Sequence, residues 1–282
     1  MEIIKPQVEL WVQDDPIAHV ARCARICYAS DKTTGNEAMY QRLIDSNHKS
    51  MLRHQSVYYI IPYKGWRLVN LQRYKECPYL EFRYDSDYIY ISTNKQFVIE
   101  HNDFDESYHE FEVDSIEFEN TPVGFSLMRY TFKVITQIST SRELNRVSPN
   151  NISEQSTRYV NISKKGGAIC QPHWMTDKDV KTLKDKTFNC EDKVYEYFNA
   201  CRRNISEYDL LLRIGMLPED ARGVLPLDTA TVCVYTYSIN QWRDIIDLRY
   251  YGTTGKPHPN AVIIAGMIRD ELIKLGYSFR DK

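Results

Sequence analysis

The sequence lacks several features that would place it in a large class at once. It has no apolar run long enough to cross a bilayer, and residues 1–6 do not have the pattern of a signal peptide. It has no excess of basic charge, because 36 Lys and Arg stand against 38 Asp and Glu. We therefore expect a cytoplasmic protein that binds neither membrane nor nucleic acid.

Common metal and cofactor motifs are missing too. The seven cysteines form no C-x-x-C pair, and no Cys/His group has zinc spacing, so we expect free thiols in a reducing compartment and no metal. The chain has neither G-x-G-x-x-G after a strand nor G-x-x-x-x-G-K-[ST]. A bound nucleotide must therefore be held largely by side chains.

The remaining pattern is that of a globular protein that mixes strands with helices. Strands are predicted at residues 8–12, 56–62, 87–92, 129–135 and 229–237. Helices are predicted from Pro16, at 36–45 with Asn36 as cap, and at 136–146, 191–214, 240–249 and 260–275. Because these elements do not alternate as repeated βαβ units, the sequence predicts a single α+β domain over residues 1–282, not a Rossmann sheet.

Residues 63–124 are aromatic and acidic and are harder to interpret. Residues 100–120 carry nine Asp and Glu, which predicts a surface excursion rather than core. A docking face is the alternative, although a run of charge is usually a solvated surface.

Three polar segments are candidates for a binding site. Residues 141–159 contain three Arg, and Ser156 and Arg158 would share one side of an extended backbone, where they could hold a phosphate or a pyrimidine edge. A surface loop with local hydrogen bonds is the alternative. Arg222 lies in a short turn before a strand, and Arg249 is predicted to face inward at a helix end while Arg243 is solvated.

Together with a fourth segment, residues 48–54, these segments resemble one family, the flavin-dependent thymidylate synthases, from about Ala18 onward. The family signature is Arg-His-Arg, seven residues, Ser, and then Arg-Tyr; the present chain has R-V-S, seven residues, and S-T-R-Y. The resembling motifs follow in order at residues 48–50, 146–148, 156–159, 221–226, 247–249 and 252–259.

The resemblance implies a mainly antiparallel sheet flanked by helices, with a variable insertion at about residues 63–124. It implies reductive methylation of dUMP to dTMP, with methylenetetrahydrofolate as carbon donor and FAD reduced by NADPH. It also implies a homotetramer in which FAD and dUMP lie where subunits meet.

Site residues follow from the same resemblance. Arg249 is the expected catalytic residue, because a fixed cation near the uracil imide stabilises charge that develops on the ring. The expected dUMP contacts are Glu143, Arg146, Glu154, Gln155, Ser156, Thr157, Arg158, Arg222 and Arg249. The expected FAD contacts are His48, Ser50, Arg53, Arg146, Val147, Ser148, Glu154, Ser238, Asn240 and Asp244.

The chain departs from the family on the flavin side. Val147 and Ser148 replace His-Arg, and Arg53 stands where the family usually has Glu. We hypothesise that Arg53 or Lys49 compensates for the lost cations. Three interpretations remain open: an active enzyme, a relative that binds dUMP or a similar nucleotide without flavin chemistry, and a scaffold without a small ligand.

Overall fold

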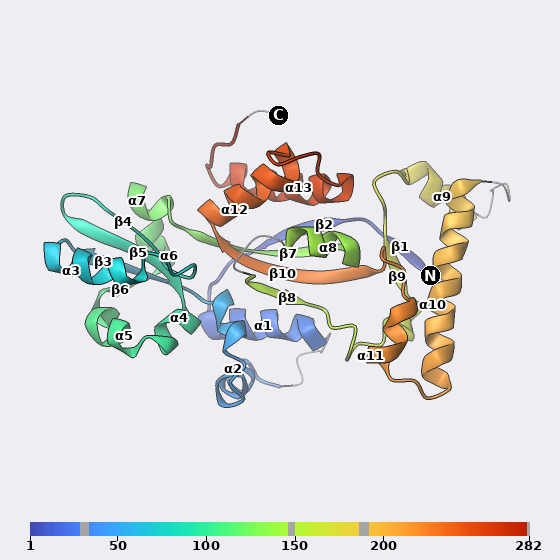
Figure 1. Ribbon diagram of the computed structural model, residues 1–282, viewed down its shortest axis with the longest axis horizontal. Coiled ribbons are helices and arrows are strands. Elements are labelled where there is room, and N and C mark those ends of the chain that lie inside the picture. Colours follow the sequence, from blue (N-terminus) through green and yellow to red (C-terminus); the bar gives the residue numbers. More distant parts are fainter. Residues whose placement is uncertain (29–33, 146–149, 186–191, 281–282) are drawn as a thin grey trace.

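Two long antiparallel strands form the middle of the molecule (Figure 1). Strand β7 (Arg129–Gln137) pairs with β10 (Ala230–Ser238) along its whole length. Strand β2 (Gln7–Trp11) extends the sheet beyond β7, and β8 (Ile152–Glu154) extends it beyond β10. The computed structural model describes residues 1–28, 34–145, 150–185 and 192–280.

The two faces of this central sheet differ in character. One face is apolar, with β7 residues such as Phe132 opposite Tyr235, and it packs against α12 (Ile239–Ile246) and α13 (Pro259–Lys274). The other face lies toward α1 (Pro16–Tyr28), on the opposite side of the sheet in Figure 1. Because side chains alternate along a strand, the polar residues of β7 and β10 fall together on this second face.

A second antiparallel sheet lies at the left of Figure 1, in the order β4-β5-β3-β6. Its strands are β4 (Glu81–Tyr84), β5 (Tyr88–Asn94), β3 (Ser56–Pro62) and β6 (Glu112–Val113). Its helices are α3 (Gly65–Leu71), α4 (Lys95–Glu100), α5 (Asn102–Tyr108), α6 (Ser115–Glu119) and α7 (Pro122–Phe125), with short 3₁₀ turns η2 (Gln72–Tyr74) and η3 (His109–Phe111).

The prediction that residues 100–120 form a surface excursion is wrong. Phe104, Tyr108 and Phe118 are buried, the first two in the core of the second sheet and the third against the central cluster. Acidic residues between these aromatic residues face water. Because they are numerous, the sequence of the segment resembles a surface and does not reveal its buried positions. The segment is therefore folded structure rather than a loop.

A third region lies at the right of Figure 1. Strands β1 (Glu2–Ile4) and β9 (Ala168–Cys170) pair in parallel. Near them lie α9 (Asp177–Asp185), the long helix α10 (Lys193–Arg213) and α11 (Pro218–Ala221). Short 3₁₀ turns η4 (Ile162–Lys165) and η5 (Arg222–Val224) complete the region.

The α+β prediction with antiparallel sheets is confirmed, and so are most predicted elements. The helix predicted at 136–146 is shorter, α8 (Ile138–Leu144), because Thr136 and Gln137 pair with β10 as part of β7. Helix α2 (Asn36–Asp45) begins at Asn36, with Gly35 in the cap position. That the chain is one domain stays a prediction.

Two predicted absences can be compared with the described residues. No helix among them has the length and apolar character needed to span a membrane. The cysteines described there carry free thiols, at positions 23, 27, 77, 170, 201 and 233.

Candidate active site

The predicted phosphate-binding residues surround one turn that follows β8. Residues 157–159 form the turn, so the backbone is not extended there, and the Ser156 hydroxyl accepts a hydrogen bond from the Arg158 N–H at 3.1 Å. Arg222, at the start of η5, donates from Nη1 to Thr157 Oγ1 at 3.2 Å. The structure therefore brings Arg222 to the turn that carries Arg158, although 64 positions separate them.

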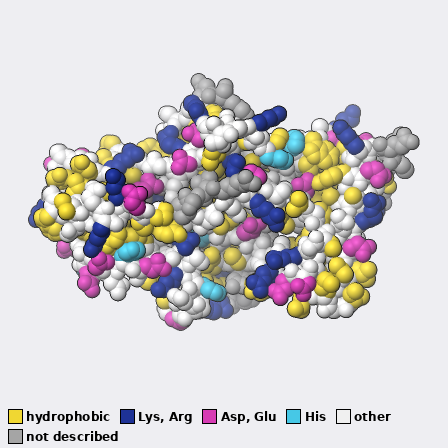
Figure 2. Space-filling view, in the orientation of Figure 1, with side chains coloured by type: hydrophobic (Ala, Val, Ile, Leu, Met, Phe, Trp, Pro, Cys, Tyr) yellow, Lys and Arg dark blue, Asp and Glu magenta, His cyan; other side chains and the backbone are white. Residues whose placement is uncertain are grey.

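Both guanidinium groups of this turn are accessible. Arg158 donates from Nε and Nη2 to Glu219 Oε2, at 3.1 and 3.0 Å, and its side chain is 51% exposed. Arg222 is also exposed. Figure 2 shows Lys and Arg side chains beside acidic ones over α11. Exposed ion pairs are weak, so a dianionic phosphate can compete with Glu219 for these donors.

Arg249 belongs to a separate contact. It lies in a π-helical turn, η6 (Asp247–Tyr251), which ends at Gly252 with φ +72°. Its Nε donates to the Glu143 carbonyl oxygen at 2.8 Å, and its Nη1 lies 3.4 Å from Glu143 Oε2. With 13% of its side chain exposed, Arg249 faces largely inward, as predicted. Single π-helical turns are frequent at functional sites.

Glu154 is held at the end of β8. Its Oε1 accepts hydrogen bonds from the hydroxyls of Ser141 and Thr231, at 2.9 and 3.1 Å. Burial raises the pKa of its carboxyl group, and these hydrogen bonds oppose the rise. The next residue, Gln155, donates its backbone N–H to the Val232 carbonyl oxygen at 2.9 Å.

The expected flavin contacts of the first half of the chain lie on η1 (Lys49–His54) and the residue before it. His48 and Ser50 are exposed. Arg53 is engaged: its Nε donates to Gln96 Oε1 at 2.5 Å, and its guanidinium lies 4.8 Å from the centre of the Tyr79 ring. Arg146, Val147 and Ser148 lie outside the described residues.

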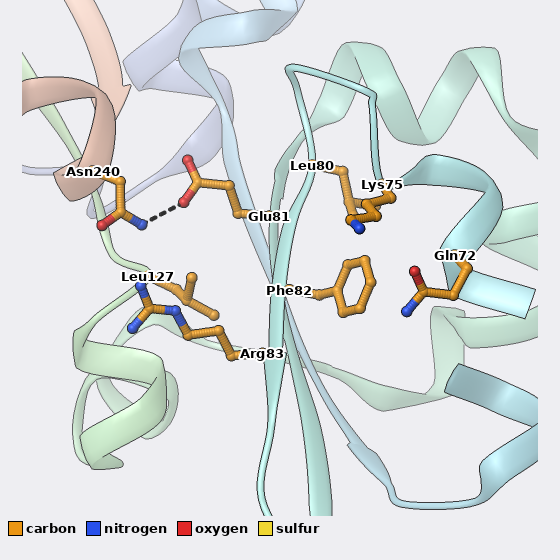
Figure 3. A pocket seen from close by; sticks show the side chains of 8 residues that line it. All are labelled: Gln72, Lys75, Leu80, Glu81, Phe82, Arg83, Leu127 and Asn240. Atoms are coloured by element: carbon orange, nitrogen blue, oxygen red, sulfur yellow. Dashed lines mark hydrogen bonds between the residues drawn. The ribbon is translucent and has the colours of Figure 1, made fainter. Parts of the chain in front are cut away.

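Two of the expected flavin contacts of the second half, Ser238 and Asn240, lie at the start of α12 and bond to Glu81 of the second sheet, and Figure 3 shows Asn240 beside Glu81. The Ser238 hydroxyl donates to Glu81 Oε1, and Asn240 Nδ2 donates to Glu81 Oε2 at 2.6 Å. Partial burial raises the pKa of Asp244, and the negative charges of Asp247 and Glu81 add to the rise.

The contacts of these residues show whether they can bind FAD as they stand. The pyrophosphate of FAD is an anion that needs free donors and positive charge. Here the side-chain donors of Ser238 and Asn240 are bonded to a carboxylate, and Asp244 adds negative charge. These residues do not fit a pyrophosphate as they stand.

Sequence reasoning missed a polar network beneath α1. Arg22 Nη2 donates to His19 Nδ1 at 2.9 Å, so His19 carries its proton on Nε2 and donates to Thr131. The chain of hydrogen bonds continues through Thr236 to His54 Nδ1, at 2.7 and 2.8 Å.

The network ends at β8 and its histidines are neutral. His54 Nε2 lies 3.2 Å from the Ser153 hydroxyl. Burial lowers the pKa of His54 to about 3 and that of His19 to about 4. Polar residues that alternate with apolar ones in β7 and β10 were the available signal for this network.

A family model described as "Thymidylate synthase complementing protein" matches residues 120–272. This chain belongs to that family. The match covers more than half of the sequence and includes β7, β10, Arg222 and Arg249. The resemblance stated from the sequence is therefore confirmed at the level of the family.

The sequence identity of this chain to individual family members is low. A flavin-dependent thymidylate synthase of Haloarcula marismortui is 24% identical over 144 residues, which cover 47% of this chain and 56% of the relative. The chain thus spans about half the length of this curated relative.

Two solved structures have lower similarity. One is the UMP/dUMP methylase PolB from Streptomyces cacaoi bound with 5-Br dUMP, with TM-score 0.47, 18% identity, and 98% and 93% of the two chains covered. The other is Thymidylate Synthase X (ThyX) from Helicobacter pylori with FAD and dUMP, with TM-score 0.38, 15% identity, and 50% and 66% covered.

Proposed function

We propose that this chain binds dUMP and carries out its reductive methylation to dTMP. Methylenetetrahydrofolate is the proposed carbon donor, and FAD reduced by NADPH is the proposed reductant. Membership of the family supports the proposal, because the matched span, residues 120–272, contains every proposed dUMP contact from Glu143 to Arg249. We further propose a cytoplasmic homotetramer with sites shared between subunits.

One observation carries the proposal: two exposed guanidinium groups meet at a single turn inside the matched span, because Arg158 belongs to the turn and Arg222 donates to Thr157 in it. In the proposed complex they bind the nucleotide phosphate through charge-assisted hydrogen bonds, which are stronger than neutral ones. Thr157 of the same turn, and Gln155 and Ser156 just before it, contribute polar groups. Arg146 is proposed to lie between dUMP and the flavin.

Arg249 is the proposed catalytic residue. Its Nε is already fixed by the Glu143 carbonyl oxygen, so the guanidinium plane is oriented before any ligand binds. A cation held in this way stabilises negative charge on the uracil ring without having to reorganise during the reaction. Glu154, with its raised pKa, is proposed to accept or donate a hydrogen bond at the nucleotide.

A second function is favoured by one specific observation. Glu81 already occupies the side-chain donors of Ser238 and Asn240, two of the expected flavin contacts. A chain that binds dUMP but not FAD would be a nucleotide-binding relative without catalysis. The visible absorbance of the purified protein, measured before and after incubation with FAD, separates the two functions.

The phosphate-binding role is tested by calorimetric titration of dUMP. Because Arg222→Ala removes one of two phosphate cations, we expect dUMP affinity to fall at least about tenfold. Arg203→Ala is the matched control, since Arg203 is an exposed arginine on the neighbouring helix α10 and should not affect affinity. If the folded wild-type chain fails to bind dUMP, or both variants bind equally, the proposal is wrong.

A further inference from the structure

Glu81 connects two parts of the fold that are far apart in sequence. It is the first residue of β4, at the free edge of the second sheet. Its carboxylate reaches Ser238 and Asn240, where β10 passes into α12. Both carboxylate oxygens are used, one for each donor. Glu81 therefore occupies a set of donors that would suit any small oxyanion.

A buried cation lies on the same side of the central sheet. Arg129 is the register partner of Ser238, and paired residues of antiparallel strands point to the same face. Arg129 is only 6% exposed, and its Nε and Nη2 have no hydrogen-bond partner among the described residues. Burial lowers the pKa of Arg129, and the charge of Glu81 opposes that effect.

This buried guanidinium is an unusual feature. Buried N–H groups without partners are unfavourable, and a buried cation without a hydrogen-bonded counterion is more so. Glu81 bonds to Ser238, the residue paired with Arg129 in the sheet, so its negative charge lies near the guanidinium while its oxygens remain bonded to Ser238 and Asn240. No acidic side chain among the described residues is seen to hydrogen-bond to Nε or Nη2 of Arg129. An additional anion beside this guanidinium would therefore be favourable.

The space into which Glu81 can move is also present. A cavity of about 390 Å³ borders Glu81 and Asn240, and Lys75 and Arg83 line it as well. In Figure 3 Glu81 and Arg83 point toward Asn240, while Phe82 points to the other side of β4. Of the two cations, Arg83 lies on the same side of β4 as Glu81 in Figure 3 and can accept the carboxylate when it leaves its present donors, whereas Lys75 lies on the side of Phe82.

We propose that Glu81 is a built-in gate of an anion-binding site formed by Ser238, Asn240 and Arg129. In the present state the carboxylate closes the site. When the side chain turns away, the same donors bind a phosphoryl or pyrophosphoryl group of a ligand. This inference rests on the proposed function in taking that ligand to be FAD.

The gate explains why this chain has hydrogen-bond donors at the expected flavin positions, Ser238 and Asn240, although the site does not fit a pyrophosphate while Glu81 occupies it. A carboxylate and a phosphate accept hydrogen bonds from the same groups, so one excludes the other. The alternative is that Glu81 is a permanent tie between the two sheets. In that case its removal weakens the fold and opens no binding site.

The test is a titration of FAD, followed by quenching of its fluorescence, into the wild-type chain, Glu81→Ala and Glu81→Gln. We expect both variants to bind FAD at least about tenfold more tightly, because the competing charge is gone. Glu76→Gln is the matched control: Glu76 is an exposed carboxylate five residues earlier, and its substitution should leave FAD affinity unchanged.

Two additional measurements test whether Arg129 and a bound pyrophosphate account for the gain in FAD affinity. Arg129→Met added to Glu81→Gln should cancel the gain, and inorganic pyrophosphate should displace FAD from Glu81→Gln. If a folded Glu81 variant binds FAD no better than the wild-type chain, the gate is overturned. Titration of dUMP into the same samples separates that failure from failure of the proposed function: dUMP binding is retained in the first case and absent in the second.

Discussion

The two buried histidines predict that the protein loses stability as the pH falls from 7 to 5. The folded-state pKa values, about 3 for His54 and about 4 for His19, lie below the usual value of 6.5. The unfolded chain therefore binds protons that the folded chain does not. Stability from the neutral imidazoles is present above pH 6.5 and is lost as the pH falls below it.

The magnitude follows from the two pKa values. Between pH 7 and 5 each imidazole lowers the free energy of unfolding by about 2 kcal/mol, so the pair lowers it by about 4 kcal/mol. The structure gives the cause: both rings are buried, and positive charge on Arg22 beside His19, and on Arg129 and Arg53 near His54, opposes a further cation.

The assay is urea unfolding at pH 7 and pH 5, for the wild-type chain and His54→Gln. The Gln side chain keeps one donor and one acceptor but does not titrate. Between pH 7 and pH 5 the variant should therefore lose about 2 kcal/mol less stability than the wild-type chain. His109→Gln is the control, because His109 is exposed, and it should behave like the wild-type chain. An equal loss in His54→Gln and the wild-type chain would refute the reasoning.

Three further substitutions have defined outcomes. Arg249→Lys keeps the charge but loses the Nε donor to Glu143, so dTMP formation should fall at least about 100-fold at saturating dUMP; unchanged turnover would exclude an oriented guanidinium. Phe104→Ala should cost about 3–5 kcal/mol in urea unfolding, and a loss below about 1 kcal/mol would contradict its place in a core. Gly167→Ala should lower the melting temperature, because φ is +67° and the new Cβ would lie 2.5 Å from Ile205 Cγ2; an unchanged value would contradict this local geometry.

Long regular elements could be predicted from the sequence. Helix α10 (Lys193–Arg213) and helix α13 (Pro259–Lys274) each differ from the prediction by one or two residues at either end. Their apolar residues repeat without interruption over several turns, and a Gly follows within two residues of each helix end. A continuous pattern of this kind depends little on the rest of the fold.

The second sheet could not be predicted in the same way. Asp and Glu alternate with its buried aromatic residues, so the average composition of residues 100–120 resembles a surface. Strand β4 is only four residues long, and its contact with Ser238 joins positions 157 apart in the sequence. Such a contact depends on how two sheets pack, which no local pattern encodes.

The candidate site was predicted as a set of residues rather than as an arrangement. The order of motifs led to Arg158, Arg222 and Arg249, and the structure joins the first two at one turn. Their acidic neighbours were not anticipated, because Glu219 belongs to a helix whose position depends on the packing of α10 and α11.

The release of tritium from dUMP labelled at C5 measures the proposed methylation directly. With methylenetetrahydrofolate, NADPH and FAD present, we expect the wild-type chain or the Glu81→Ala variant to release tritium. The amount of tritium released should equal the amount of dTMP formed. If neither folded chain releases tritium, whether or not it binds dUMP, methylation of dUMP by this chain is contradicted.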